Sequence, residues 1–86
     1  MADIAGHFDV IHPCQCRAAR GLLDWTQDHL ARAAGVSRST VRDFENGRHA
    51  LQRSTAALIE AALRQAGVVL LCGSDGGFGV RLASAG

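Results

Sequence analysis

The side chains with the clearest chemistry form a short polar series: Arg38, Ser39, Arg42 and Asp43. On an α-helix these four residues would share one face, with Val41 and Phe44 on the opposite, buried face. An arginine guanidinium can donate two parallel hydrogen bonds to a guanine edge, which discriminates that base by about 1–3 kcal/mol. Asp43 is the ambiguous member, because its carboxylate can accept from a cytosine amine or simply orient Arg42 or Arg38. The spacing therefore predicts a helix whose outer face reads bases in a DNA major groove.

The basic residues of the chain are unevenly placed, although the formal net charge is only +1. All nine are arginine, and four of them fall between residues 38 and 53, where the only acidic residues are Asp43 and Glu45. Bulk charge gives no sign of nucleic-acid binding, but this cluster does, since a rigid guanidinium fork matches phosphates and guanine edges. The alternative is that these arginines are ordinary solvated surface charges. A GC-rich genome would explain the lack of lysine, but it would not explain the clustering.

The polar series lies in the second of two short helical patterns between Thr26 and Gly47. Thr26 and Ser37 are good N-cap residues, since a hydroxyl can accept from the unpaired amides of a first helical turn. Two helices are therefore predicted, over residues 26–34 and 37–45. Gly35 suits the left-handed conformation at the turn between them, and Gly47 closes the second helix. A helix, a glycine turn and a second helix with a polar outer face make the helix-turn-helix pattern.

Two further helices are predicted on either side of this pair. Pro13 suits the first position of a helix over residues 13–23, because its missing amide would be unpaired there anyway. Ser54 is expected to cap a fourth helix that runs to about Ala66, before Gly67. The expected inward residues are Cys16, Ala19 and Leu23 in the first helix and Leu58, Ile59, Ala62, Leu63 and Ala66 in the fourth.

Residues 67–86 change from helical to strand-like sequence. A β-prone run, Val68–Cys72, is followed by turn residues 73–77 and by a second run, Phe78–Leu82, which predicts a hairpin. A lone hairpin is marginal in water and an apolar edge strand invites pairing, so the tail is the expected dimerisation element. The interface residues would be Val68, Val69, Leu70 and Leu71. The alternative is a hairpin packed on the helices of a monomer.

The N-terminal residues 1–12 lack a sustained helical pattern. We expect them to form a loose arm from which Phe8, Val10 and Ile11 dock on the body. The chain thus divides into this arm, a helical domain over residues 13–66 and the hairpin over residues 67–86.

The composition argues against an enzyme. Eighty-six residues make one small domain, and its core is rich in alanine, with only three phenylalanines and one tryptophan. That leaves little room for a deep pocket, and the sequence shows no nucleophile–base pairing, phosphate-binding loop or strong metal spacing. It also shows no signal peptide and no apolar run long enough to span a bilayer, so the expected location is the cytoplasm.

The three cysteines, Cys14, Cys16 and Cys72, make an odd count without paired CxxC spacing. With His7 or His12 they would in principle supply four metal ligands. Cys16, however, falls on the apolar face of its predicted helix, where a neutral thiol behaves as a small hydrophobe. We therefore expect reduced thiols, no metal site and no cofactor.

Several of these motifs together resemble the lambda-repressor-like (XRE) helix-turn-helix family. The resemblance rests on Gln27 at the start of the second helix, on the turn Ala-Gly-Val-Ser at residues 34–37, and on the ending Phe-Glu-Asn-Gly at residues 44–47. It extends from about Cys16 to Ala66. It implies a mainly α, four- to five-helix DNA-binding domain, with the C-terminal β-hairpin outside that core.

The resemblance implies a role for each matching residue. The base-reading positions would be Arg38, Ser39 and Asp43, to which the helix-face pattern adds Arg42. The positions that contact phosphates or the DNA backbone would be Gln27, Thr40, Asn46, Arg48 and Arg53. Gln27 would also brace the third helix. Arg20 and Glu45 would form a buried ion pair that ties the first helix to the end of the third.

The resulting expectation is a transcriptional regulator that binds double-stranded DNA as a homodimer, with its third helix in the major groove of a dyad operator. Two alternatives stay open. One is an antitoxin that autoregulates its operon and binds a small protein partner through the tail or the arm. The other is a helix-turn-helix module used for protein contacts only. No membrane partner is expected.

Overall fold

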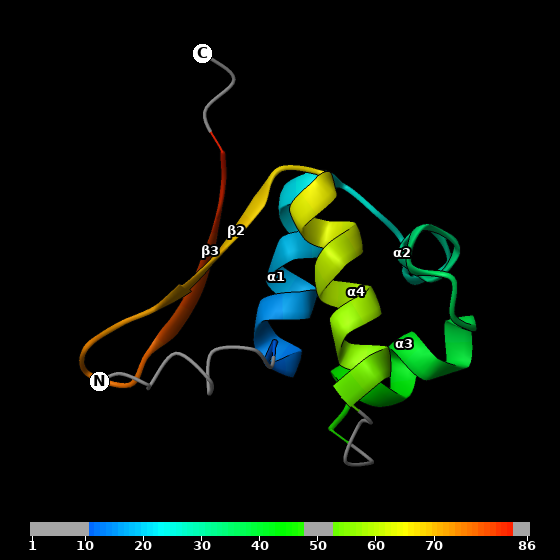
Figure 1. The fold of residues 1–86 in the computed structure, drawn as a ribbon, viewed down its shortest axis with the longest axis horizontal. Helices are drawn as coiled ribbons and strands as arrows, with labels where there is room; N and C mark the ends of the chain where they lie inside the picture. The colour runs from blue at the N-terminus through cyan, green and yellow to red at the C-terminus, as the bar shows by residue number, and fades with distance from the viewer. Residues whose placement is uncertain (1–10, 48–52, 84–86) are drawn as a thin grey trace.

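The computed structural model describes residues 11–47 and 53–83, and within them it has four helices followed by a two-stranded hairpin (Figure 1). The helices are α1 (Pro13–Leu23), α2 (Gln27–Ala34), α3 (Arg38–Glu45) and α4 (Arg53–Gln65), and the strands are β2 (Val68–Cys72) and β3 (Phe78–Leu82). The predicted mainly α fold with a C-terminal hairpin is confirmed, and the elements lie close to their predicted bounds.

Helix α1 is fixed at both ends by its own sequence. Pro13 occupies its first position, and at its C-terminal end Asp24 adopts a left-handed conformation with φ of 60°. The Asp24 amide donates there to the last-turn carbonyls of the helix. Cys16 and Ala19 are fully buried, as predicted. Gly21 lies on the exposed side with nothing packed against it, so it weakens the helix by about 0.5–1 kcal/mol relative to alanine without any packing role.

Helix α4 supplies much of the core through Ala56, Ile59, Ala62 and Leu63. Two details predicted for this helix are wrong. Leu58 is 48% exposed rather than buried, because successive helical residues lie about 100° apart and Leu58 is rotated away from the Ile59 side. The helix also begins at Arg53, so Ser54 lies in its first turn rather than capping it.

The core joins the four helices to the first strand. Its fully buried larger side chains are Ile11, Cys16, Leu30, Val41, Ile59 and Leu63. Leu23, an inward residue predicted for α1, is partly buried and packs against the same core. Ile11 belongs to the predicted N-terminal arm, and its side chain is buried. The other two arm residues expected to dock, Phe8 and Val10, lie outside the described residues.

The hairpin pairs β2 and β3 antiparallel, with Val68 opposite Leu82 and Cys72 opposite Phe78. Residues 73–77 connect the two strands, and Gly76 in this loop has a positive φ of 87°, which glycine adopts without a Cβ clash. In Figure 1 the hairpin and α3 lie on opposite sides of the α1–α4 pair.

The hairpin packs on the helices of its own chain. Val68 is buried, Leu70 is partly buried against the core, and β3 runs along α1. The Gln15 side-chain amide of α1 donates to the carbonyl oxygens of Leu71 (3.0 Å) and Gly79 (3.1 Å), so it holds both strands. Two of the four predicted interface residues, Val68 and Leu70, are thus engaged within the chain.

Candidate nucleic-acid interface

The α2–α3 unit is built by the capping residues that the sequence predicted. At the start of α2, Thr26 Oγ1 accepts from the His29 amide at 3.0 Å. At the start of α3, Ser37 Oγ accepts from the Thr40 amide at 3.1 Å. Gly35 between the helices has φ of 77°, a conformation that strains residues with a Cβ but not glycine. Local sequence therefore determines where both helices begin and where the chain turns.

Helix α3 has one buried and one exposed face. The buried side chains are Val41, Phe44 and Glu45. The exposed ones are Arg38, Ser39 and Arg42, and Asp43 is half-buried. The structure thus brings three of the predicted base-reading residues onto one accessible face and leaves Asp43 at its margin.

Asp43 lies beside Arg42, with the Arg42 Nε 3.5 Å from the Asp43 Oδ1. Both side chains are partly exposed, so the contact contributes less than about 1 kcal/mol to stability. Its effect is local: it offsets a negative charge that would repel phosphates, and it restricts where the Arg42 guanidinium points. This contact fits the orienting role for Asp43 that the sequence left open.

Ser39 and Thr40 take part in a hydroxyl cluster at the start of α3. The Ser37 Oγ lies 2.8 Å from the Thr40 Oγ1 and 3.1 Å from the Ser39 Oγ. Each hydroxyl can both donate and accept, so the cluster orients Ser39, which is exposed, and Thr40, which is partly buried. Ser39 is therefore fully accessible in front of α3, and Thr40 only in part.

The buried Glu45 carboxylate at the end of α3 connects three helices. Arg20 of α1 binds it with two hydrogen bonds, Nε to Oε2 at 2.7 Å and Nη2 to Oε1 at 2.8 Å. The Gln27 amide of α2 donates to Oε1 at 3.0 Å, and the Cys16 thiol donates to Oε2 at 3.1 Å. Burial disfavours the charged carboxylate, but these donors outweigh it and hold the pKa of Glu45 below its ordinary value. The Arg20–Glu45 pair implied by the resemblance is present, and Gln27 braces it.

The carboxylate also contributes to the pKa shifts of its neighbours. Burial first, and then the hydrogen bond to Glu45, raise the pKa of the Cys16 thiol far above its ordinary value. The hydrogen bond to Glu45 likewise raises the pKa of Arg20. Cys16 therefore acts as a protonated donor within the core.

A second arginine of α1 holds the main chain of the same residue. The Arg17 Nη1 donates to the carbonyl oxygen of Glu45, the last residue of α3. The last carbonyls of a helix lack intrahelical partners and carry partial negative charge, so a guanidinium is favourable there. Helix α1 thus fixes both the side chain and the main chain at the end of α3, which sets the direction of α3 relative to the domain.

A shallow cleft of about 550 Å³ borders α3 and is lined by Arg20, Thr26, Gln27, Asp28 and Arg38. It includes the first turn of α2, where unpaired amides and the helix dipole favour an anion. The Arg20 guanidinium is bound to Glu45, whereas Arg38 is exposed. The cleft thus places the exposed Arg38 guanidinium beside the start of α2, with the Asp28 carboxylate also in its lining.

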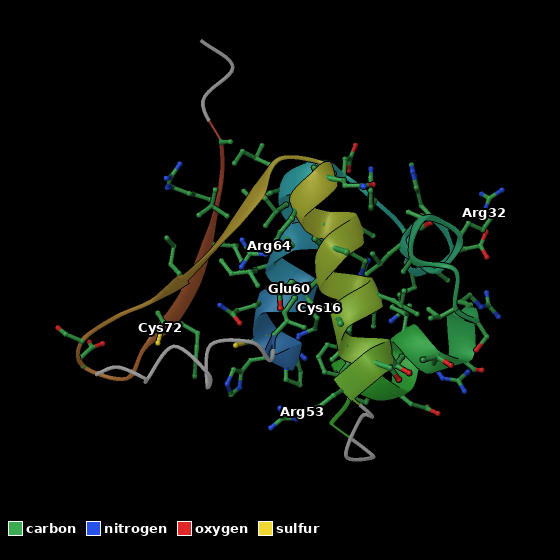
Figure 2. The ribbon with its side chains drawn as sticks, in the orientation of Figure 1. Cys16, Arg32, Arg53, Glu60, Arg64 and Cys72 are labelled. Atoms are coloured by element: carbon green, nitrogen blue, oxygen red, sulfur yellow. The ribbon has the colours of Figure 1, made fainter. Side chains whose placement is uncertain are left out.

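The other predicted phosphate contacts are only partly described. Asn46, the residue after α3, and Arg53, the first residue of α4, are both exposed. Figure 2 shows Arg53 at the start of α4. Arg48 lies outside the described residues.

Two residues of this framework, Gln15 and Arg17, were missed by the sequence reasoning. Gln15 had a local signal, because glutamine at the third position of a helix reaches back to the preceding amide, and its Oε1 does accept from His12 at 3.0 Å. Its bonds to strand residues 56 and 64 positions away have no such signal. Arg17 precedes Arg20 by one helical turn, and that spacing places both on one face of α1.

The cysteines are dispersed rather than clustered. Figure 2 shows Cys16 within the helices and Cys72 out on the hairpin, and all three thiols are free. Over residues 11–47 and 53–83, no group of three or more His, Cys, Asp or Glu side chains is placed to hold a metal ion. In the same ranges, each helix is too short or too polar to cross a membrane.

Comparison with known proteins gives a match to the same part of the chain. A helix-turn-helix family model matches residues 17–66, more than half of the sequence. The matched region runs from within α1 to just past the end of α4, so it leaves out the hairpin. No curated protein matches the chain.

Proposed function

Because the chain belongs to the lambda-repressor-like helix-turn-helix family of DNA-binding regulators, we propose that it is a sequence-specific transcriptional regulator that places α3 in the major groove of a dyad operator. The observation that carries this proposal is the arrangement of α3. Its outer side chains, Arg38, Ser39 and Arg42, are exposed, while α1 holds its last residue through Arg17 and Arg20. A helix held in one direction can present the same side chains to the same base pairs each time it binds.

Three side chains of α3 would read the bases. Arg38, at the first position of the helix, is suited to a guanine through two parallel hydrogen bonds. Ser39 can donate or accept and is therefore tolerant of several bases. Arg42 lies one turn further along, and Asp43 limits its orientation. We assign Asp43 an orienting role in preference to direct contact with cytosine.

The remaining polar residues would position the domain on the DNA backbone: Gln27, Thr40, Asn46, Arg48 and Arg53. Gln27 has two amide N–H groups and donates to Glu45, so it can brace α3 and meet a phosphate from the same nitrogen. Contacts of this kind give affinity that falls with salt, with a slope of about −0.9 per phosphate in log K against log salt.

A dyad operator requires two copies related by a two-fold axis, so the proposal includes a homodimer on double-stranded DNA. Selection of bound fragments from a random DNA pool by the full chain tests it. The expected result is enrichment of a sequence with an internal dyad. An Arg32→Ala variant serves as the control, because Arg32 is also an exposed arginine but lies on the last turn of α2 and not on α3.

Two other results of the selection would point elsewhere. No enrichment at physiological salt would contradict DNA recognition and favour a module used for protein contacts only. An antitoxin would give the same enrichment, and it would differ by retaining a small protein partner through purification.

A further inference from the structure

The hairpin carries an unusual share of the exposed apolar surface. Of the five large exposed hydrophobic side chains among the described residues, three belong to it: Leu71 at 40%, Phe78 at 46% and Leu82 at 43%. Its two strands contain one charged residue, Arg81. By the pairing register, Phe78 and Leu82 share the face of Val68, whereas Leu71 lies on the opposite, outer face of the sheet, so its exposure is the one that the helices of this chain do not explain.

The hairpin is held in place before any partner binds. The Gln15 amide donates to one carbonyl on each strand, and the His12 ring packs on Phe78 with centroids 3.7 Å apart. Val68 anchors the start of β2 in the core. A partner would therefore meet a preformed surface, so little ordering entropy would oppose binding.

Among the described residues, no main chain pairs with the outer edge of β2. Over the described residues the sheet has only these two strands, and β3 is the one that runs along α1. The Gly73 amide donates to Gly77, and bonded pairs alternate along an antiparallel ladder. The Gly73–Gly77 pair is bonded, so the pair two residues further along, Leu71 and Gly79, is bonded as well. The residues on either side of Leu71, namely Leu70 and Cys72, therefore direct their N–H and C=O groups away from β3, to the outer edge of β2.

We propose that this β2 surface, namely the edge at Leu70–Cys72 with the Val69 and Leu71 side chains, docks a second copy of the chain by antiparallel β2–β2 pairing. A strand paired antiparallel with its own copy is two-fold symmetric, so each copy offers the other the same surface. Because β2 carries no charge, the pairing places no like charges opposite each other. It also extends a marginal two-stranded sheet to four strands.

The second copy is favoured over other partners by this symmetry. A two-fold axis is what a dyad operator requires, and to that extent the inference rests on the proposed function. Of the residues that the sequence predicted for the interface, Val69 and Leu71 contribute side chains, Leu70 contributes its main chain, and Val68 stays in its own core.

The test is sedimentation of the full chain without DNA, from micromolar to millimolar concentration. We compare the wild type with Leu71→Lys and with Leu58→Lys, because Leu58 is also exposed, somewhat more than Leu71, but lies on α4. The wild type and Leu58→Lys should dimerise, and Leu71→Lys should dimerise at least tenfold more weakly, since an edge lysine blocks strand pairing. Circular dichroism confirms that both variants fold.

Amide hydrogen exchange gives a second measurement. Its dependence on protein concentration reports on association and would be absent if Leu71 only stabilised the fold of one chain. The outward amides of Leu70 and Cys72 should become protected as the wild-type concentration rises, whereas the Leu71 amide, bonded within the hairpin, should be protected throughout. A wild type that stays monomeric, or a dimer that Leu71→Lys leaves intact, overturns the proposal. DNA binding is scored separately: the Leu71→Lys monomer should still bind a single half-site, so a failed interface and a failed DNA proposal are distinguishable.

Discussion

Replacing Glu45 with glutamine should destabilise the whole domain rather than only change its DNA preference. The substitution keeps the shape of the side chain, but it removes the charge that Arg20 binds at 2.7 and 2.8 Å. It also turns one acceptor oxygen into an amide N–H₂ group. That group must then face donors from Arg20 and either Gln27 or Cys16, depending on its orientation.

The size of the effect follows from the burial of the pair. Removing one partner of a fully buried ion pair costs about 3–5 kcal/mol, because the other charge is left without compensation. Glu45 is 2% exposed and Arg20 is 20% exposed, so water reaches the stranded guanidinium. We therefore expect a loss of about 2–3 kcal/mol, which for a domain of this size lowers Tm by about 8–24 °C.

Urea unfolding followed by circular dichroism measures this loss, and Asp28→Asn is the matched control. Asp28 also pairs with an arginine, Arg32 at 3.3 Å, but both side chains are largely exposed. Neutralising that carboxylate should cost less than about 1 kcal/mol. If both variants lose the same small amount, the buried cluster is not what holds α3, and the reasoning fails.

The pH dependence of the stability of the wild type and of Glu45→Gln provides an independent check. Because the folded state holds the pKa of Glu45 below its ordinary value, the ionised carboxylate stabilises the fold above that ordinary value. This stabilisation is lost as pH falls through the lowered pKa of the folded state. The stability difference between the wild type and Glu45→Gln should therefore shrink towards acid, and a difference that is constant with pH would contradict the assignment.

Four further predictions concern the surface and the hairpin. Arg38→Ala should relax base preference at one position of each half-site in a selection experiment, whereas equal weakening on all sequences would make Arg38 a phosphate contact. Arg17→Gln should lower the free energy of unfolding in urea by about 1 kcal/mol and leave the salt slope of DNA binding unchanged, since its guanidinium binds Glu45; a slope reduced by about 0.9 would assign it to a phosphate. Gln15→Ala should cost about 1–3 kcal/mol and speed exchange of the hairpin amides, while Gln65→Ala, an exposed glutamine, should change stability by less than about 0.5 kcal/mol. Because the hairpin and α3 lie on opposite sides of the α1–α4 pair, selected half-sites should be more than one turn, about 10 base pairs, apart; a one-turn spacing would place the interface elsewhere.

Most of the fold was predictable because its boundaries depend on neighbouring residues. Thr26 and Ser37 accept from amides three positions ahead, and Gly35 turns the chain through its own backbone conformation. The strand bounds followed from β-prone runs on either side of a glycine-rich turn. The outer face of α3 followed from helical spacing alone, and the family resemblance implied the Arg20–Glu45 pair.

What failed or was missed involves the position of one element against another. Leu58 has the right residue type for a core, and spacing alone did not show that its side of α4 is left uncovered. Ser54 has the right chemistry for a cap, but the helix begins one residue before it.

The sequence by itself determined the helices, the turn between α2 and α3, the hairpin and the polar face of α3, since each depends on contacts within about four residues or on simple periodicity. Only the tertiary structure decided that Gln15 holds both strands, that Arg17 binds the end of α3, and that Val68 belongs to the core while Leu71 faces outward. These contacts join residues far apart in the chain. Their geometry depends on how the elements pack, and no local pattern of residue types encodes that packing.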